Sequence, residues 1–524
     1  MIYDVIIIGA GSAGSVIAER LSADPSRSVL LLEAGPDYPD FDTLPVELKH
    51  GYGVDPKLWN KAFGSLSTHS WGYEGKATSK NTSINVPRGK VVGGSSAVNA
   101  QIFLRGLPED YQNWVDQGND GWGYQELMPY LLEIEKDPIG GDFHNNNGHV
   151  TVKRWKKSEM LTDQIAFYNA CQSIGFEESP DQNDPDSTGI GPTPMNNADG
   201  IRWSTALTYL DAARHRLNLT IRPNIFVRSL IFDGNHAVGL IAQSGNEFFK
   251  LHAKEIILSA GAYGSPQLLM LSGIGPRKEL EKHGIEVLKN IPGIGKNLRD
   301  HPQVQLTFST KKGFNQDPLN PRLQNALRYT ATKSKYRNDM FIHPISYASE
   351  FDTYTVPTGQ KLRDGELGIG MIAVIYLADG SGTVTLRSPN PETQPEIDFN
   401  YLAEKNDRDR LKEAIHICLK LSKEDAYKDI IDHVINPSQS DLESEDALDD
   451  WLKRKVRTSH HGSGTCKMGP DTDPMSVVDN EGRIHGLRGI RVADASIMPD
   501  CIRANTNVTT MMIGERISKF IIDN

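Results

Sequence analysis

Residues 5–14 read VIIIGAGSAG, four β-branched residues followed by three glycines at the first, third and sixth positions of the next six residues. A continuous β-branched run is typical of a strand buried on both faces of a parallel sheet. Apolar spacing predicts a helix from Ser15 to Leu21, and a second buried strand, VLLL at 29–32, ends at Glu33. Strand, glycine turn, helix, strand and acid therefore follow in the order of a dinucleotide-binding unit.

Each glycine of this motif has a separate task. Gly9 permits the tight turn, Gly11 lets the backbone approach a pyrophosphate, and Gly14 lets the helix pack closely on the strand. The helix N-terminus then directs unpaired amides toward the phosphate charge. Glu33 is placed to accept hydrogen bonds from both hydroxyls of an adenosine ribose. The motif alone does not distinguish FAD from a nicotinamide cofactor, because an acid at the ribose argues only against a 2′-phosphate.

Composition excludes several classes of protein. The chain has 524 residues, 38% of them hydrophobic, which at about 100–200 residues per domain predicts two to four domains. A formal charge of −11 without a basic tract argues against nucleic acid or an anionic membrane as a partner. The four cysteines show no paired spacing, which argues against disulfides and structural zinc, and we expect no metal site. There is no apolar run of 18 residues and no signal-peptide pattern, so we expect a cytoplasmic protein without a membrane span.

Five blocks farther along the chain have distinctive sequences. They are Pro87–Asn99 (continuing to Arg105-Gly106), Gly200–Thr205, Ser265–Gly275, Gly293–His301 and Arg491–Pro499. Through them the chain resembles the glucose-methanol-choline (GMC) oxidoreductase family of flavoproteins, whose two signatures match the first and third blocks. The resemblance is collinear over nearly the whole chain. It implies bound FAD and an α/β fold, with a Rossmann-like FAD-binding domain and an α+β substrate domain that contains an antiparallel sheet.

The resemblance also implies an order of domains. Residues 1–300 would form the FAD-binding domain, with loop insertions near 140–197, and residues 301–455 the substrate-binding domain. Residues 456–524 would return to the FAD-binding domain and carry the catalytic residues. Two loops rich in Gly, Asn, Asp and Pro, at 142–147 and 181–197, are expected to cover the active-site entrance.

Residues implied to contact FAD come from every part of the chain. Gly9, Gly11 and Gly14 would hold the pyrophosphate, while some relatives attach FAD through a histidine at the position of Val98, so the flavin is expected to be noncovalent. The predicted FAD contacts are Gly9, Gly11, Ser12, Ala13, Gly14, Glu33, Ala34, Arg88, Val92, Gly94, Ser95, Asn99, Ala100, Val227, Ala260, Asp494, Ala495, Asn505 and Thr506.

Some of these blocks also have a purely structural interpretation. Ser95 and Ser96 fit a plain loop, and Asp494 fits the cap of a turn. Residues 265–275 fit a helix cap and turn without ligand contact. In the substrate region, one segment could face the pocket, although a core role is favoured for each of its residues: Phe341, Ile342, His343 and Tyr347.

The expected catalytic residues lie in the final stretch of the chain. Alcohol oxidation needs a base near neutral pH, which suits histidine. The small-residue loop 459–469 resembles the family's His-x-x-Gly-Thr-x-x-Met-Gly block and makes His461 the catalytic histidine. Asn505 matches the position where relatives place histidine or asparagine, and it would orient the substrate oxygen. His460 departs from the family pattern, and either a pocket or a packing role is open for it. Asn507 is expected to cap a helix from Val508 to about Ile522.

The leading interpretation is FAD-dependent oxidation of a primary or secondary alcohol, such as a sugar, polyol, choline-like compound or aryl alcohol. The electron acceptor would be dioxygen or another oxidant, and the sequence leaves the oligomeric state open. One alternative is a hydroxynitrile-lyase-type enzyme, since this fold also hosts lyases that bind FAD without using its redox chemistry. The other is a noncatalytic flavin-binding protein.

Overall fold

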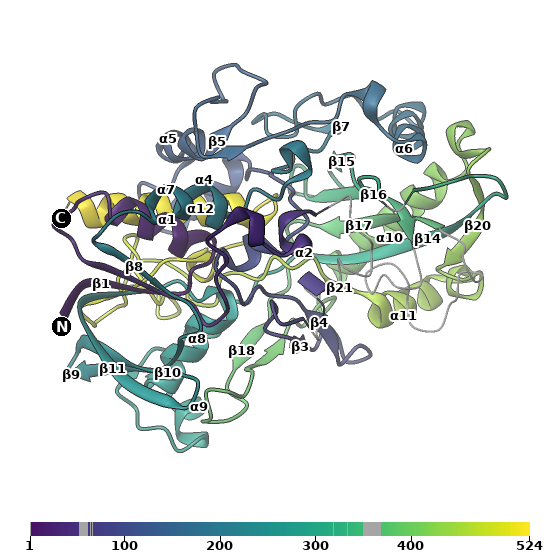
Figure 1. Ribbon diagram of the computed structural model, residues 1–524. Coiled ribbons are helices and arrows are strands. Elements are labelled where there is room, and N and C mark those ends of the chain that lie inside the picture. The colour runs from purple at the N-terminus through teal and green to yellow at the C-terminus, as the bar shows by residue number, and fades with distance from the viewer. Residues whose placement is uncertain are drawn as a thin grey trace.

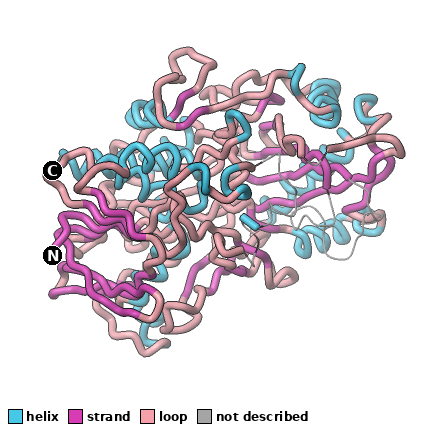
Figure 2. Tube along the Cα trace, in the orientation of Figure 1, coloured by secondary structure: helices cyan, strands magenta, loops and turns pink. Residues whose placement is uncertain are grey.

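The computed structural model contains two large β-sheets, one in the half that holds both termini and one at the other end (Figures 1 and 2). It describes residues 2–51, 61–62, 64, 67–317, 319–332, 334–348 and 368–523, without the side chains of Tyr347 and Ala348. One of the predicted pocket candidates, the side chain of Tyr347, therefore lies outside the described residues.

The first sheet is formed by the N-terminal unit and strands from much later in the chain. Its order is β8-β2-β1-β11-β10-β9, with β22 beside β11. Strands β8, β2, β1, β11 and β22 run parallel, while β9 and β10 are antiparallel additions. The strands are β1 (Ile2–Ile8), β2 (Val29–Leu32), β8 (Leu219–Arg222), β9 (Phe226–Asp233), β10 (His236–Ser244), β11 (Glu247–Leu258) and β22 (Ile490–Val492).

The second sheet is antiparallel. Its order is β20-β14-β17-β16-β15-β7, with β21 beside β14. Its strands are β7 (Gly189–Pro192), β14 (Pro302–Thr310), β15 (Asn325–Tyr329), β16 (Met340–Ala348), β17 (Gly368–Ile375), β20 (Ile431–Asn436) and β21 (Arg457–Thr458). The segment 181–197, expected to be only a loop, contains β7. This strand pairs with β15 and forms an edge strand of the sheet.

Shorter strand pairs lie around these sheets. They are β3 (Tyr73–Gly75) with β4 (Ile84–Val86), β5 (Glu135–Lys136) with β6 (Val150–Thr151), β12 (Ile274–Gly275) with β13 (Lys289–Asn290), and β18 (Thr383–Thr385) with β19 (Glu396–Asp398). The helices are α1 (Ser12–Leu21), α2 (Val46–Lys49), α4 (Pro108–Asp116), α5 (Tyr124–Ile134), α6 (Thr162–Ser173), α7 (Asp211–Ala213), α8 (Gly261–Leu271), α9 (Arg277–Lys282), α10 (Lys405–Leu421), α11 (Glu445–Lys455) and α12 (Thr506–Asp523).

The last helix packs on the first (Figure 1). The contact is close because Gly514 on α12 faces the backbone of Ala13, where an added Cβ would lie 3.0 Å from the Ala13 carbonyl oxygen. Both helices begin earlier than the apolar spacing indicated, at Ser12 and Thr506. Asn507 therefore lies inside the first turn of α12, and its side-chain oxygen accepts a 2.6 Å hydrogen bond from the Ser12 hydroxyl instead of capping the helix.

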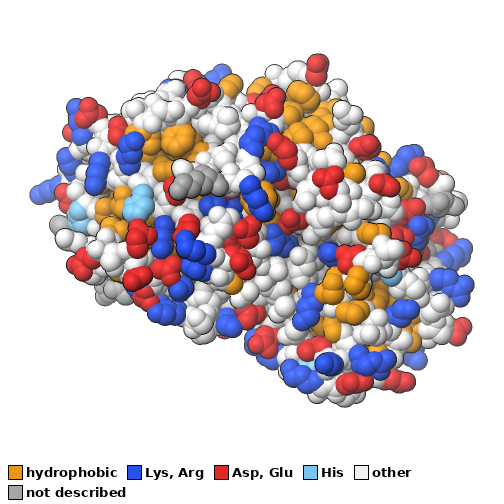
Figure 3. Space-filling view, turned by 180° about the vertical axis from the view of Figure 1, so that it is seen from behind, with side chains coloured by type: hydrophobic (Ala, Val, Ile, Leu, Met, Phe, Trp, Pro, Cys, Tyr) orange, Lys and Arg blue, Asp and Glu red, His pale blue; other side chains and the backbone are white. Residues whose placement is uncertain are grey.

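Two hydrophobic clusters account for most of the buried core. The larger one surrounds β1, β2, β11 and the contact of α1 with α12, and the second fills the space between the antiparallel sheet and α6, α10 and α11. No helix among the described residues is long and apolar enough to cross a membrane. On the face shown in Figure 3, basic and acidic side chains are interspersed.

Candidate active site

A cavity of about 700 Å³ collects residues from distant parts of the chain. Its lining includes the glycine turn after β1, the loop 87–102, the start of α8, side chains from the second sheet, and residues just before and within α12. The parallel strands of the first sheet end at this cavity, as expected for the ligand site of an open α/β sheet.

The glycine turn has the shape that a dinucleotide requires. Gly9 has φ +101°, and an added Cβ would lie 2.4 Å from the Ser259 carbonyl oxygen. At Gly14 a Cβ would lie 1.9 Å from the Gly9 carbonyl oxygen, so only glycine lets the helix sit on the strand. A Cβ on Gly11, in contrast, would meet only the Cα of Gly94, at 3.9 Å. The backbone in front of Gly11 is thus open to a ligand, and the cradle fits a pyrophosphate.

Glu33 lies at the end of β2, against the cavity. Its Oε2 accepts a hydrogen bond from the amide of Ala10 at 3.0 Å, and its Oε1 accepts one from Gly35 at 2.9 Å. Burial raises the pKa of this carboxyl to about 7, although the backbone amides oppose the rise. Each oxygen keeps a second lone pair, so the carboxyl can still accept hydrogen bonds from ribose hydroxyls.

Nearly all of the predicted site residues line this one cavity. Gly14 and Val92 do not, because Gly14 packs against the Gly9 backbone and Val92 is buried in the larger core cluster. The predicted residues found in the lining are Gly9, Gly11, Ser12, Ala13, Glu33, Ala34, Arg88, Gly94, Ser95, Asn99, Ala100, Val227, Ala260, His461, Asp494, Ala495, Asn505 and Thr506.

Asp494 combines the two roles considered for it. One carboxylate oxygen accepts from the amide of Ser496, which is a turn cap, while the other accepts from the Ser265 hydroxyl and the Gly261 amide. Gln267 and Leu268 of the same helix, α8, reach the cavity wall. The second family signature therefore holds Asp494 and contributes to the lining.

His461 and Asn505 meet within the cavity lining. His461 follows β21 in a loop, and Asn505 directly precedes α12. The Asn505 Nδ2 lies 2.9 Å from His461 Nε2, and the Asn505 Oδ1 accepts a hydrogen bond from the Tyr376 hydroxyl at 3.3 Å. Since Nδ2 is a donor, this orientation leaves Nε2 as the unprotonated acceptor of the imidazole.

The other nitrogen of the ring contacts a second imidazole. His461 Nδ1 lies 2.9 Å from Nδ1 of His301, which is fully buried. With Nε2 as an acceptor, Nδ1 carries the proton and donates a hydrogen bond to His301 Nδ1. The predicted catalytic ring is therefore held through both nitrogens, with its basic lone pair on the Asn505 side.

Asp300 fixes the backbone of this pair. One oxygen of its buried carboxylate accepts from the amides of His461, at 2.9 Å, and His301, at 2.7 Å. The other accepts from the hydroxyls of Tyr401, at 2.6 Å, and Thr458. One side chain from the 293–301 block thus holds both imidazole-bearing segments in place.

The surroundings keep both imidazoles neutral. Burial lowers the pKa of His461 well below 6.5, and the neighbouring His301, His460 and Arg88 add to the effect. Burial also lowers the pKa of His301 to about 3. His461 is therefore an unprotonated base at neutral pH, as general-base chemistry requires.

His460 lies next to the catalytic position with a left-handed backbone, φ +68°. Its ring is buried and lines the cavity, and burial lowers its pKa to about 3. Its carbonyl accepts a 2.6 Å hydrogen bond from Arg88, whose guanidinium lies 5.1 Å from the centre of the Tyr263 ring. The pocket role considered for His460 is compatible with this position.

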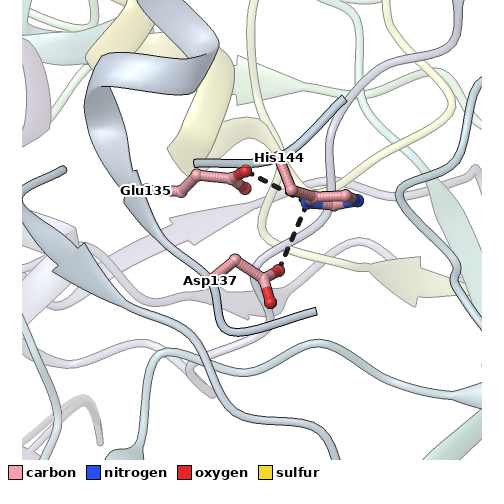
Figure 4. A group of neighbouring side chains, drawn as sticks. All are labelled: Glu135, Asp137 and His144. Carbon is pink, nitrogen blue, oxygen red and sulfur yellow. Dashed lines mark hydrogen bonds and ion pairs between the residues drawn. The ribbon is translucent and has the colours of Figure 1, made fainter. Parts of the chain in front are cut away.

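A separate cluster of acids and histidine lies outside the cavity (Figure 4). Nδ1 of His144 is 3.0 Å from Glu135 and 3.5 Å from Asp137, and its Nε2 is 2.7 Å from Asp181. Both ring nitrogens are therefore occupied by carboxylates, which raises the pKa of His144 to about 9. Ion pairs to Arg105 and Arg154 complete a charge network. The geometry is that of an imidazolium among carboxylates.

This network changes the interpretation of the two predicted entrance loops. No residue of 142–147 or 181–197 lines the cavity. The loops instead bind each other through His144 and Asp181, and Arg105 holds the first loop by donating to the carbonyl of Phe143 at 2.6 Å. The prediction that they cover the entrance receives no support from the lining.

Several residues of the site were not predicted as such. His301 lies in a block quoted for the resemblance, but its contact with His461 depends on a backbone arrangement that no spacing reveals. Gln303 and Tyr376 face the cavity, and so does His343, for which a core role was favoured. The alternation of side chains along β14, β16 and β17 could have predicted which residues share one face of the sheet, but not that this face lines a cavity.

Comparison with known proteins agrees with this site. Family models described as GMC oxidoreductase match residues 3–303 and 378–514. The chain belongs to the GMC oxidoreductase family. It is 33% identical over its whole length to the oxygen-dependent choline dehydrogenase of Photobacterium profundum, covering 93% of that protein. The corresponding enzyme of Brucella anthropi is 32% identical, with 99% of this chain and 95% of that protein covered.

Solved structures show the same fold. Pyridoxine 4-oxidase from Mesorbium loti superposes with a TM-score of 0.89 at 29% identity, covering 100% of this chain and 99% of that one. A fungal aryl-alcohol oxidase gives 0.81 at 20% identity, with 99% of both chains covered, and supports the fold alone. The predicted α/β fold class, the FAD dependence and the oxidation of CH–OH donors are confirmed at the level of the family.

Proposed function

We propose that this chain oxidises a primary or secondary alcohol to the carbonyl, with His461 as the base and Asn505 as the residue that orients the hydroxyl. The observation that carries the proposal is the 2.9 Å approach of Asn505 Nδ2 to the unprotonated Nε2 of His461, in a cavity continuous with the glycine cradle. A substrate hydroxyl that replaced this contact would donate to Nε2 and accept from Nδ2.

The chain's own residues handle the proton. As the alcohol becomes a carbonyl, its O–H bond breaks and the proton passes to His461 Nε2. The Nδ1–H···His301 contact stabilises the imidazolium that forms. When bound, FAD supplies the electron sink that takes the hydride from the carbinol carbon. Atoms and charge then balance, since the alcohol loses one proton and one hydride.

The start of α12 favours a negative charge beside it. Thr506 and Asn507, in the first turn of this 18-residue helix, line the cavity. First-turn amides have no partner inside the helix, and the helix dipole adds partial positive charge. Thr506 is therefore proposed to contact the flavin end of the cofactor, where reduction deposits negative charge.

We propose that FAD is held without a covalent bond, because Val98 occupies the lining where some relatives carry a histidine. The substrate is proposed to be a sugar, polyol, choline-like or aryl alcohol. Dioxygen or another acceptor would reoxidise the flavin. The four cysteines are buried and unbridged, which supports the cytoplasmic location expected from the sequence. The domain bounds 1–300, 301–455 and 456–524 stay a proposal as well.

The lyase alternative is not favoured, since the curated and structural relatives described above are oxidoreductases. Anaerobic mixing of the purified holoenzyme with a panel of alcohols tests the proposed function. We expect the oxidised flavin absorbance to bleach with at least one alcohol. Cleavage of a cyanohydrin without bleaching would support the lyase instead, and neither reaction would support a noncatalytic flavin protein.

A further inference from the structure

The inner face of the second sheet forms one wall of the cavity, which we call the roof. Its register brings Gln303, Val374 and Phe341 into one row, and His343 beside Ile372 in the next. The residues that this sheet and its flanking segments contribute to the lining are Gln303, Arg322, Leu323, His343, Ile345, Ile372, Val374 and Tyr376. Half of these side chains are aliphatic, and the other half carry polar groups.

Among these polar side chains, His343 has an unusual environment. Its ring is buried, with 6% of the residue exposed, and its Nδ1 has no hydrogen-bond partner in the described part of the chain. With the proton on Nε2, this cavity-lining imidazole offers a hydrogen-bond donor to a ligand.

A series of ring contacts connects His343 to the proposed reacting centre. The imidazole lies 4.6 Å from the centre of Phe341, which stacks on Tyr376 at 4.9 Å. The Tyr376 hydroxyl contacts Asn505, and His343 is near enough to lower the pKa of His461. A ligand that reached from His461 along this wall would meet His343.

The positions of the carboxylates in the cavity lining also bear on which substrates fit the roof. Its described carboxylates are Glu33, Asp494 and Glu392, and each is held by groups around the first sheet. Glu33 binds two backbone amides, Asp494 binds α8, and Glu392 pairs with Arg228 on β9. Among the described residues, the roof contributes no carboxylate to the lining.

We propose that His343 determines substrate specificity by donating an Nε2–H hydrogen bond to an acceptor atom of the alcohol remote from its reacting hydroxyl. The substrate class is then a neutral or anionic alcohol with such an acceptor, for example a ring nitrogen, a carbonyl or a carboxylate. A quaternary ammonium alcohol has no lone pair to offer to His343. This inference rests on the proposed function, because it assumes that the reacting hydroxyl lies at His461.

The test compares substrates that differ only at the proposed acceptor. Anaerobic flavin reduction is measured with benzyl alcohol and with 2-, 3- and 4-pyridylmethanol, using wild type and His343→Phe. We expect at least one pyridylmethanol to have a KM lower than that of benzyl alcohol by about threefold to tenfold, as one hydrogen bond provides. His343→Phe should remove this preference, so that the pyridyl substrate and benzyl alcohol then have similar KM values.

Conservative variants and a binding measurement separate recognition from a structural effect. His343→Gln retains a side-chain N–H donor and should recover part of the preference for the pyridyl substrate. The dissociation constants of nicotinamide and benzamide, read from the flavin spectrum, should show the same difference without turnover. Thermal unfolding of both variants should match wild type, because Nδ1 loses no partner when the ring is replaced.

A second pair of substrates differs mainly in the charge of the substrate itself. Choline and its neutral isostere 3,3-dimethylbutan-1-ol have nearly the same shape, and we expect the neutral alcohol to have the higher kcat/KM. A tenfold preference for choline, or equal effects of His343→Phe on benzyl and pyridyl alcohols, would overturn this inference and leave the proposed function intact. A holoenzyme reduced by none of the alcohols would refute both.

Discussion

The two ends of the cavity are built on different principles. At the dinucleotide end, Gly9, Gly11 and Gly14 act within a few residues of one another, so their spacing already determines the shape of the backbone. At the substrate end, Gln303 and His343 come from strands β14 and β16 of an antiparallel sheet, and Tyr376 directly follows strand β17. Only strand pairing brings them together. The spacing of residues along the chain therefore predicts the cofactor site. The substrate site depends on the register of strand pairing, which only the structure shows.

The largest effect is expected at the locally determined end. Gly14→Val would place a Cβ 1.9 Å from the Gly9 carbonyl oxygen, so α1 would have to leave the strand. We expect loss of bound FAD and of most soluble protein, measured by flavin absorbance and yield after purification. Gly11→Ala is the matched control, since its Cβ meets no protein atom within 3.8 Å. This variant should fold, but its affinity for FAD should be lower by about tenfold or more. The added methyl group would occupy space beside the backbone where the pyrophosphate is expected to bind.

Equal retention of FAD in both variants would contradict the division between the two glycines. In that case the cradle would tolerate added volume, and the predicted contact of the pyrophosphate with the backbone at Gly11 would have to be abandoned.

Strands β1 and β2 of the first sheet could be predicted because residues 5–8 and 29–32 are short, continuous apolar runs that are buried. The long strands β10 and β11 could not, because exposed and buried residues are mixed along them. The helix start was misjudged because Ser12 and Ala13 have no marked apolar spacing, although the turn geometry admits them into α1. Strand β7 was missed because GIGP at 189–192 has weak strand propensity and pairs only through its backbone. His343 was assigned to the core because a buried histidine on a strand looks the same whichever wall it faces.

The next largest effect is expected at His461, where residues of both ends meet. His461→Ala removes the group that takes the hydroxyl proton, and we expect anaerobic flavin reduction to slow by about 10²- to 10⁴-fold, or more. The flavin spectrum and the melting temperature of the holoenzyme should stay close to wild type. Reduction at an unchanged rate would exclude His461 as the base and would move the reacting hydroxyl elsewhere in the cavity.

A smaller effect is expected from the group that holds the base. His301→Phe removes the acceptor of the His461 Nδ1–H while keeping an aromatic ring near Tyr376. We expect flavin reduction to slow by about tenfold, because the tautomer with a free Nε2 is no longer enforced. His301→Gln keeps an acceptor in this region and should lose less. A purely structural role would instead lower the melting temperature of both variants without separating their reduction rates.

The pH dependence follows from the lowered pKa of His461. The base must be unprotonated, and burial moves its pKa well below 6.5, so kcat/KM should stay constant as pH falls through 6.5 and decline only in more acidic solution. The measurement is the acid limb of kcat/KM for flavin reduction, compared between wild type and Asn505→Ala. A limb centred at or above pH 6.5 would indicate that the imidazole is solvated and that the pocket does not enforce its neutral form.

The smallest effect is expected from the charge network of His144, far from either end of the cavity. Its pKa is raised from 6.5 to about 9 by carboxylates, so its protonation stabilises the fold fully below pH 6.5 and progressively less as pH rises through about 9. At pH 6 His144→Gln should cost about 1–2 kcal/mol of unfolding free energy, the value expected for a half-screened ion-pair network. The difference should shrink by pH 10. Flavin reduction should be unaffected, because neither loop of the network lines the cavity. A loss of activity equal to that of His301→Phe would instead show that these loops control the active site.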